Sequence, residues 1–153
     1  MKIVLQRVKE ASVRVADQTI ARIGPGVCLL VGIEKGDTQE DVNFLVNKVT
    51  ELRIFPDTEG RMNLSLLDIQ GEVLAVSQFT LAGSVKKGRR PSFDKAEVPE
   101  KAETLLEDFV QKIKDLGLRI QTGLFGAKMD VQLVNDGPVT FIIPSQRSSD
   151  QLK

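Results

Sequence analysis

The sequence predicts an α+β domain: a mostly antiparallel, curled β-sheet with a barrel-like core and two main helices. Three observations lead to this fold class. Short apolar runs with strand character recur through the chain, two longer segments carry apolar residues at helical spacing, and most connections are short. A chain of 153 residues is the size of one domain. We therefore expect a single domain at residues 1–145 and a polar, disordered C-terminal tail at residues 146–153.

Four strands are expected in the first part of the chain: Lys2–Arg7, Ser12–Val15, Gln18–Ile23 and Val27–Ile33. The first two are predicted to form a hairpin about a polar turn at Lys9 and Glu10, and the last two a hairpin turned by Gly24, Pro25 and Gly26. The run from Val27 to Val31 is apolar at every position, which is typical of a strand covered on both faces. Cys28 in this run is interpreted as a small core residue rather than a nucleophile.

Later strands are expected at Leu52–Asp57, Glu72–Phe79, Arg119–Thr122, Met129–Val134 and Val139–Ile143, with a short extended or irregular segment at Met62–Leu67. Gly137 and Pro138 stand between the last two strands. Glycine tolerates unusual dihedral angles and proline fixes its own φ, so the pair is typical of a turn that closes a hairpin.

Two helices complete the predicted domain. The first opens at Asp37 or Thr38, either of which can cap it, and its buried stripe is Val42, Leu45, Val46 and Val49. Pro99 suits the first turn of the second helix, which is expected to run to about Leu116 and to stop at Gly117.

The composition removes several kinds of chemistry. The chain contains no histidine, so the usual general base, most zinc sites and every His-containing triad are excluded. Neither a metal nor a cofactor is expected. One cysteine excludes an internal disulfide framework and indicates a reducing compartment, the cytoplasm. No apolar run is long enough to span a membrane. A net charge of zero argues against extended wrapping of nucleic acid but allows a local grip on the end of an RNA.

A long polar loop interrupts the pattern between Ala82 and Val98. Four cations stand within five positions of it, at Lys86, Lys87, Arg89 and Arg90. Loops of this length in small domains are usually functional or disordered. The cations are either a solvated surface or a contact to RNA phosphates, where Lys and Arg position a backbone without reading bases.

Four short strings together resemble the D-aminoacyl-tRNA deacylase family. They are Val4-Leu5-Gln6-Arg7-Val8, Arg61-Met62-Asn63-Leu64-Ser65, Ser77-Gln78-Phe79-Thr80-Leu81 and Asn135-Asp136-Gly137-Pro138-Val139-Thr140. Each string alone is weak, whereas all four in order within one domain of this length are specific. The resemblance covers the chain as far as Pro144.

This resemblance implies a homodimeric catalytic domain that hydrolyses the ester joining a D-amino acid to the 3′ end of tRNA, with no membrane or DNA partner. The family's Gly-Pro bond is cis and enters the active site of the other subunit. Carried over, Gly137 and Pro138 are the chiral filter, and Arg7 helps to hold their carbonyl groups. The strand end formed by Ser77, Gln78, Phe79 and Thr80 binds the terminal adenosine and the scissile ester. Asp136 stands where the family varies and receives no role.

The residues leave two mechanisms open. Thr80 could be a nucleophile, but a threonine hydroxyl needs an adjacent base, and the chain has no histidine to supply one. Alternatively, the site positions ester and water, backbone N–H groups near Phe79 and Thr80 stabilise the oxyanion, and the ribose 2′-hydroxyl assists. The second mechanism requires nothing that the sequence lacks.

Two other functions remain open from the residues alone. One is a binding module without catalysis that holds RNA ends or nucleotides through the loop cations. The other is a small-molecule esterase or amidase that uses Thr80 and does not need tRNA. Taken alone, Thr80 is equally a strand hydroxyl bonded to a neighbouring chain, and Phe79 an ordinary core aromatic.

Overall fold

A computed structural model describes residues 1–145, and the tail expected at residues 146–153 lies outside the described residues. The helices and strands follow the order β1 (Lys2–Val15), β2 (Gln18–Ile23), β3 (Gly26–Gly32), α1 (Gln39–Glu51), β4 (Phe55–Pro56), β5 (Met62–Leu64), α2 (Leu66–Ile69), β6 (Glu72–Ser77), the 3-10 helix η1 (Phe79–Ala82), α3 (Pro99–Asp115), β7 (Ile120–Thr122) and β8 (Asp130–Pro144).

The main sheet is organised around β1 and confirms the predicted fold class. Its order is β2-β1-β3-β6-β7, and β8 also pairs with β1. All partners of β1 are antiparallel, whereas β6 and β7 add parallel strands beyond β3. The two ends of this order approach each other, because the Arg22 amide of β2 donates a hydrogen bond to Gln121 Oε1 of β7 at 2.8 Å. The sheet is therefore a nearly closed barrel.

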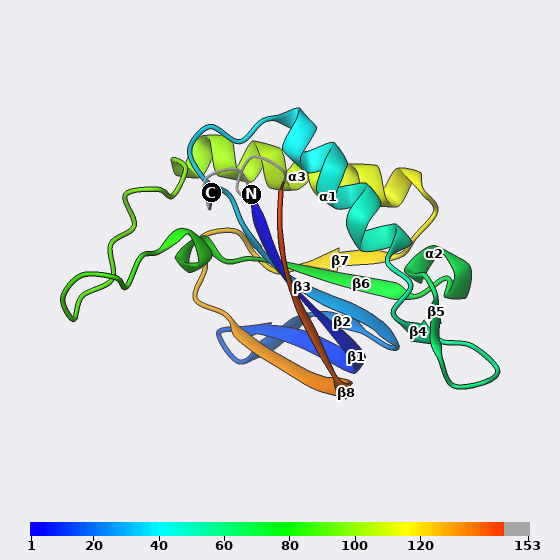
Figure 1. The fold of residues 1–153 in the computed structure, drawn as a ribbon. Coiled ribbons are helices and arrows are strands. Elements are labelled where there is room, and N and C mark those ends of the chain that lie inside the picture. The colour runs from blue at the N-terminus through cyan, green and yellow to red at the C-terminus, as the bar shows by residue number, and fades with distance from the viewer. Residues whose placement is uncertain (146–153) are drawn as a thin grey trace.

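The two main helices lie on the same side of the sheet (Figure 1). The α1 stripe that includes Leu45 and Val49 is buried, as is Phe109 of α3, and these side chains form the main core with the apolar face of β3. Thr38 caps α1 and forms a capping box with Asp41, which settles the choice between Asp37 and Thr38. No helix among residues 1–145 is long and apolar enough to cross a bilayer.

The expected hairpin turn at Lys9 and Glu10 is wrong. Both residues lie inside β1, a single strand, and their neighbours shift register against β8 between Val8 and Glu10. The two consecutive exposed polar residues therefore mark a bulge, where strand alternation is interrupted, and not a turn. The turn itself is at Ala16 and Asp17, which have φ of 49° and 64°.

The second expected hairpin is also wrong. Strands β2 and β3 do not pair with each other across Gly24 to Gly26, because each pairs with a different part of β1. Gly26 instead packs against β6, where an added Cβ would lie 1.9 Å from the carbonyl oxygen of Glu72. A glycine interpreted as a turn residue is required here for close approach between strands.

The Gly137–Pro138 pair does not close a hairpin either. Residues on both sides of it belong to β8, and both sides pair with β1. Val8 faces Asn135 and Gln6 faces Thr140, so residues 136–139 of β8 lie opposite the single residue Arg7. They form a wide bulge at the sharp bend of β8 (Figure 1).

Smaller differences concern the middle of the chain. The strand expected at Leu52–Asp57 shortens to β4, where Pro56 limits pairing. The segment Met62–Leu67 divides into β5 and the start of α2, whose N-cap is Ser65. The strand expected at Glu72–Phe79 ends at Ser77, because η1 begins at Phe79.

Candidate active site

The chain changes direction at Gln78. Ser77 ends β6, and the other three predicted site residues lie on the turn that leads into η1 instead of on a strand. The backbone N–H of Gln78 donates a hydrogen bond to the carbonyl oxygen of Val31 at 2.8 Å, and the backbone carbonyl oxygen of Gln78 accepts one from the Leu81 N–H at 3.2 Å. Ser77 and Gln78 are half-buried, and Phe79 and Thr80 are exposed. The Phe79 side chain is 57% exposed, so it is not a core aromatic.

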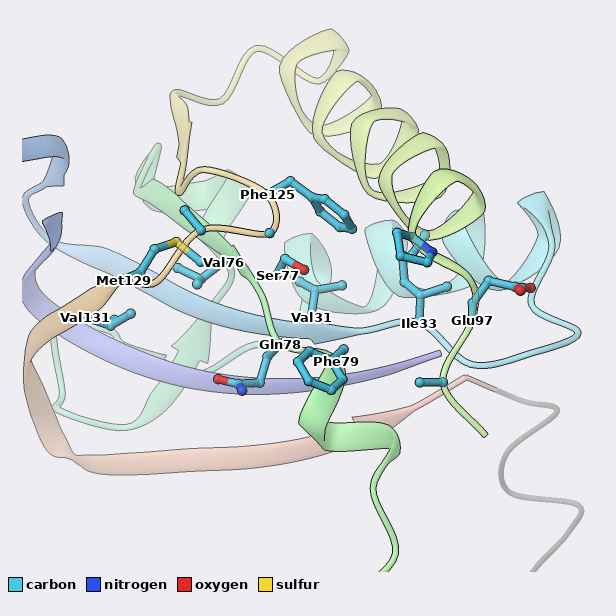
Figure 2. A pocket seen from close by; sticks show the side chains of 15 residues that line it. Val31, Ile33, Val76, Ser77, Gln78, Phe79, Glu97, Phe125, Met129 and Val131 are labelled. Carbon is cyan, nitrogen blue, oxygen red and sulfur yellow. The ribbon is translucent and has the colours of Figure 1, made fainter. Parts of the chain in front are cut away.

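A cavity of about 480 Å³ opens beside this turn. Ser77, Gln78 and Phe79 line it, together with apolar side chains from several elements: Val31, Ile33, Val76, Phe125, Met129 and Val131. Figure 2 shows Phe125 beneath helix α3 on one side of the opening and Phe79 on the other, with Ser77 and Val31 between them. A mostly apolar hollow with a few polar groups is the usual form of a small-ligand site.

Thr80 adjoins this cavity through Gln78. The Gln78 side-chain Nε2 donates a short hydrogen bond to Thr80 Oγ1. An amide donor cannot accept a proton from the hydroxyl, so this contact orients Thr80 without activating it. The amides of Phe79 and Thr80 begin η1, where the first N–H groups of a helix have no partner within the helix.

The cationic loop is anchored directly to the turn. Ser84 and Ser92 pair through their backbones, at 2.7 and 2.9 Å, and close the neck of the loop. Beyond the neck, Phe93 packs against Phe79 edge-on, with ring centroids 5.1 Å apart. The four cations Lys86, Lys87, Arg89 and Arg90 lie within the loop that this pairing closes and are all exposed. The base of the loop therefore adjoins the turn, and in Figure 1 the rest of the loop extends away from the body of the domain.

A second group of predicted site residues lies on the bulge of β8. Gly137 and Pro138 are exposed, the bond between them is cis, and Gly137 has φ of 141°. Arg7 is 9% exposed and lies beneath them. Its Nε donates to the carbonyl oxygen of Asp136 at 2.9 Å, and its Nη1 donates to the carbonyl oxygen of Ile54 at 2.6 Å. Arg7 thus holds the residue before Gly137, whereas the resemblance implied the carbonyl groups of Gly137 and Pro138 themselves.

The two groups do not meet within one chain. Among the residues of β8 and its approach, the cavity is lined by Met129 and Val131, and not by Gly137 or Pro138. Sequence reasoning missed Phe125, Phe93 and Asn135. Phe125 stands in the glycine-flanked connection 123–126, where an aromatic residue between glycines was the available signal.

Two other kinds of chemistry depend on a reactive thiol and on a metal centre. Cys28 is a fully buried core side chain, as expected, and this burial raises the pKa of its thiol to about 11. Among residues 1–145, no three His, Cys, Asp or Glu side chains are placed to hold a metal ion.

Comparison with known proteins identifies the family. Residues 4–144 match the family model described as D-Tyr-tRNA(Tyr) deacylase. The chain belongs to this family. It is 54% identical over 151 residues to a D-aminoacyl-tRNA deacylase of Geotalea uraniireducens, covering 99% of this chain and 97% of that protein. It is 53% identical over 146 residues to a D-aminoacyl-tRNA deacylase of Aquifex aeolicus, covering 95% of this chain and 99% of that protein.

Two solved structures share the deacylase family fold. The c-Myc DNA unwinding element binding protein superposes with a TM-score of 0.89 at 43% identity, over 95% of this chain and 99% of that one. A protein described as a probable eukaryotic D-amino acid tRNA deacylase superposes with a TM-score of 0.81 at 20% identity, over 93% of this chain and 97% of that one. The second likeness concerns the fold alone.

Proposed function

We propose that the protein hydrolyses the ester bond of D-aminoacyl-tRNA and releases the free D-amino acid and tRNA. It is thus a hydrolase acting on carboxylic ester bonds, and residues 1–145 form its single catalytic domain. The observation that carries the proposal is the 54% identity, along almost the whole chain, to a protein named for this activity. In this proposal, the terminal adenosine and the ester bind in the cavity beside the Ser77–Thr80 turn.

The proposal includes a homodimer in which each subunit completes the site of the other. Gly137 and Pro138 are exposed and lie outside the cavity of their own chain, so a second copy is the source from which they can reach a cavity. Exposed apolar side chains on β8 support such contact, because Phe141, Ile142 and Val134 are 41%, 70% and 44% exposed.

The filter works by exclusion. D- and L-aminoacyl esters carry the same groups, so an apolar side-chain pocket separates them poorly. Rigid backbone carbonyl groups of Gly137 and Pro138 would occupy the space into which an L side chain projects, while accepting from the amino group that both forms share. D side chains of many kinds are then tolerated. Glycine has no side chain to reject, so glycyl-tRNA is also a substrate.

The chemistry relies on placement. Water adds to the ester carbonyl carbon, the bond to the ribose 3′-oxygen breaks, and the proton from water ends on that oxygen. The N–H groups of Phe79 and Thr80 stabilise the oxyanion, where one donor contributes on the order of 3 kcal/mol. The chain contains no histidine to act as a general base. The neighbouring ribose 2′-hydroxyl therefore assists the proton transfer in this mechanism.

The cationic loop is proposed to contact the phosphates of tRNA near its 3′ end. Lys86, Lys87, Arg89 and Arg90 are exposed. Phe93, which follows the loop, packs against Phe79 of the cavity lining. The proposal assigns no DNA or membrane partner, and it places the enzyme in the cytoplasm, where its tRNA substrate is used.

A time course with D- and L-aminoacyl-tRNA at equal concentration tests the proposal. We expect catalytic release of the D-amino acid, slow release of its L form, and inhibition by uncharged tRNA. A protein that only binds RNA ends would protect both esters from hydrolysis. A small-molecule esterase would cleave simple D-amino acid esters and would not respond to uncharged tRNA. Either of these results contradicts the proposal.

A further inference from the structure

The neck of the Gly137–Pro138 bulge is closed by one side chain, Asn135. Its Oδ1 accepts a hydrogen bond from the Val139 amide at 2.7 Å, and its Nδ2 donates to the Val139 carbonyl oxygen at 3.2 Å. The carboxamide thus pairs with both backbone groups of Val139, as a neighbouring strand would. Asn135 and Val139 flank the three residues 136–138, so these contacts set how the bulge leaves the sheet.

The two hydrogen bonds between Asn135 and Val139 replace the backbone pairing with β1 that Val139 loses at the bulge. Val139 has no register partner on β1, since the paired positions on either side of it are Asn135 with Val8 and Thr140 with Gln6. Val139 is only 6% exposed, and buried N–H and C=O groups need partners. Of the side chains able to supply both a donor and an acceptor, a carboxamide has the same geometry as a peptide group.

The Asn135 carboxamide, which clamps the neck of the bulge, is also linked to the central strand β1 through Thr140. Thr140 Oγ1 accepts from Asn135 Nδ2 at 3.0 Å and from Gln6 Nε2 of β1 at 3.3 Å. On the opposite side of the bulge, Arg7 of β1 holds the Asp136 carbonyl oxygen. Gly137 and Pro138 therefore project from a neck that is fixed to β1 at both ends, while their own backbone stays exposed.

We propose that Asn135 is a positioning residue for stereoselection, and that its carboxamide fixes the direction in which Gly137 and Pro138 point. This inference rests on the proposed function. Asn135 does not line the cavity. It acts through the bulge and not on the reacting atoms. Its loss should therefore change which enantiomer is cleaved more than how fast the D ester is cleaved.

The test is Asn135→Asp, which preserves size and one acceptor but removes both N–H donors. The second carboxylate oxygen then faces the Val139 carbonyl oxygen across a former hydrogen bond, and the two acceptors repel each other. We expect the ratio of single-turnover rates for D- and L-aminoacyl-tRNA to fall by about tenfold or more, mainly because the L rate rises. Asn43→Asp, on the exposed side of α1, is the matched control and should leave the ratio unchanged.

The outcomes separate the two proposals. A large wild-type ratio that Asn135→Asp leaves within about twofold would overturn the role of Asn135 alone. Equal losses in the D and L rates would also overturn it, because they indicate a purely structural contribution. A wild-type ratio near one would overturn the proposed function and this inference with it. If Asn135→Asp does not fold, Thr140→Val decides the question. This variant removes the acceptor shared by Asn135 Nδ2 and Gln6 Nε2. A ratio lowered by several-fold supports the role of Asn135, whereas an unchanged ratio overturns it.

Discussion

The Nε atom of Arg7 lies 2.9 Å from the carbonyl oxygen of Asp136, the residue that precedes Gly137. The same guanidinium reaches the Ile54 carbonyl oxygen from another direction, before β4 begins. One buried side chain therefore joins the bulge of β8 to a segment far from it in sequence. The planar fork of arginine allows this, because it presents separate donors in fixed directions.

Replacing Arg7 by lysine should destabilise the protein and weaken enantiomer discrimination. A single ammonium group on a flexible stem cannot serve both carbonyl oxygens in the same way, so one buried acceptor loses its partner. We expect the free energy of unfolding to fall by about 1–3 kcal/mol, measured by urea denaturation. Arg61→Lys, with an 81% exposed side chain, is the control. Equal stability of the Arg7 variant and wild type would contradict this interpretation of the contacts.

Gly137→Ala should reduce discrimination between D- and L-aminoacyl-tRNA. At φ of 141° an alanine is strained, and its Cβ would lie 2.7 Å from Val139 Cγ2 and 3.2 Å from Arg7 Nη2. The bulge must therefore move. Gly60→Ala also has a positive φ, of 79°, but nothing lies within 4 Å of the added atom. Both variants place an alanine at positive φ, but only Gly137→Ala also meets neighbouring atoms at the bulge, so only Gly137→Ala should change the ratio of the two rates. No difference between them would count against a role for Gly137.

Thr80→Val should lower the single-turnover rate by less than about tenfold, because the threonine contributes orientation and its backbone amide remains. Rapid mixing of excess enzyme with D-aminoacyl-tRNA measures this step without product release. Thr80→Ser retains the hydroxyl and is the matched control. Near-complete loss in Thr80→Val, with tRNA binding intact and with activity retained in Thr80→Ser, would identify the hydroxyl as a nucleophile.

Removing two loop cations, in Arg89→Gln with Arg90→Gln, should weaken tRNA binding and leave the rate of the bound complex unchanged. Each lost phosphate contact should lower the slope of log affinity against log salt by about 0.7 for single-stranded RNA. Titrations at several salt concentrations measure this slope. Lys101→Gln removes a charge from the exposed side of α3 and should not affect it. An unchanged slope in the loop variant would mean that these cations are only a solvated surface.

The capping box of α2 should make the protein sensitive to acid. The Ser65 amide donates to Asp68 Oδ2 at 2.8 Å, and this hydrogen bond, with that of the Ser65 hydroxyl, lowers the pKa of Asp68 from its ordinary 3.8. The ionised form is thus favoured by folding, so its contribution is complete above pH 3.8 and is lost as pH falls through the lower folded value. Asp68→Asn should therefore differ from wild type in urea denaturation near neutral pH and converge with it in acid. Asp94→Asn, in an exposed loop, is the control, and a difference that persists at low pH would contradict the assignment.

Local patterns predicted most of the elements but not how they connect. The start of α1 and both ends of α3 agree with the prediction within about one residue, because apolar spacing, Thr38 and Pro99 mark them locally. Pairing depends on contacts between distant residues, and here the turn signals misled. Gly26 allows β3 and β6 to approach each other closely, and Gly137 lies in a bulge of β8. Glycine is also common in turns, so the residue type alone does not distinguish these roles.

The candidate site was only partly accessible from the sequence. Family strings located the Ser77–Thr80 turn and the Gly137–Pro138 bulge, and the resemblance implied that the pair serves the site of another subunit. Within one chain the pair lies outside the cavity. Phe93 and Phe125 reach the cavity rim from segments interpreted as a polar loop and a flexible connection. Asn135 belongs to one of the four family strings, but its partner Val139 offers only backbone atoms, which leave no trace in the sequence.

Strand β1 carries Gln6 and Arg7 and pairs with β2, β3 and β8, so its amides should be among the slowest in the molecule to exchange with deuterium. The Gly137–Pro138 bulge is held by side chains of this strand, so it should not lose its geometry before the rest of the molecule unfolds. As the protein is warmed, the number of active molecules should decline while each surviving molecule remains as discriminating as before.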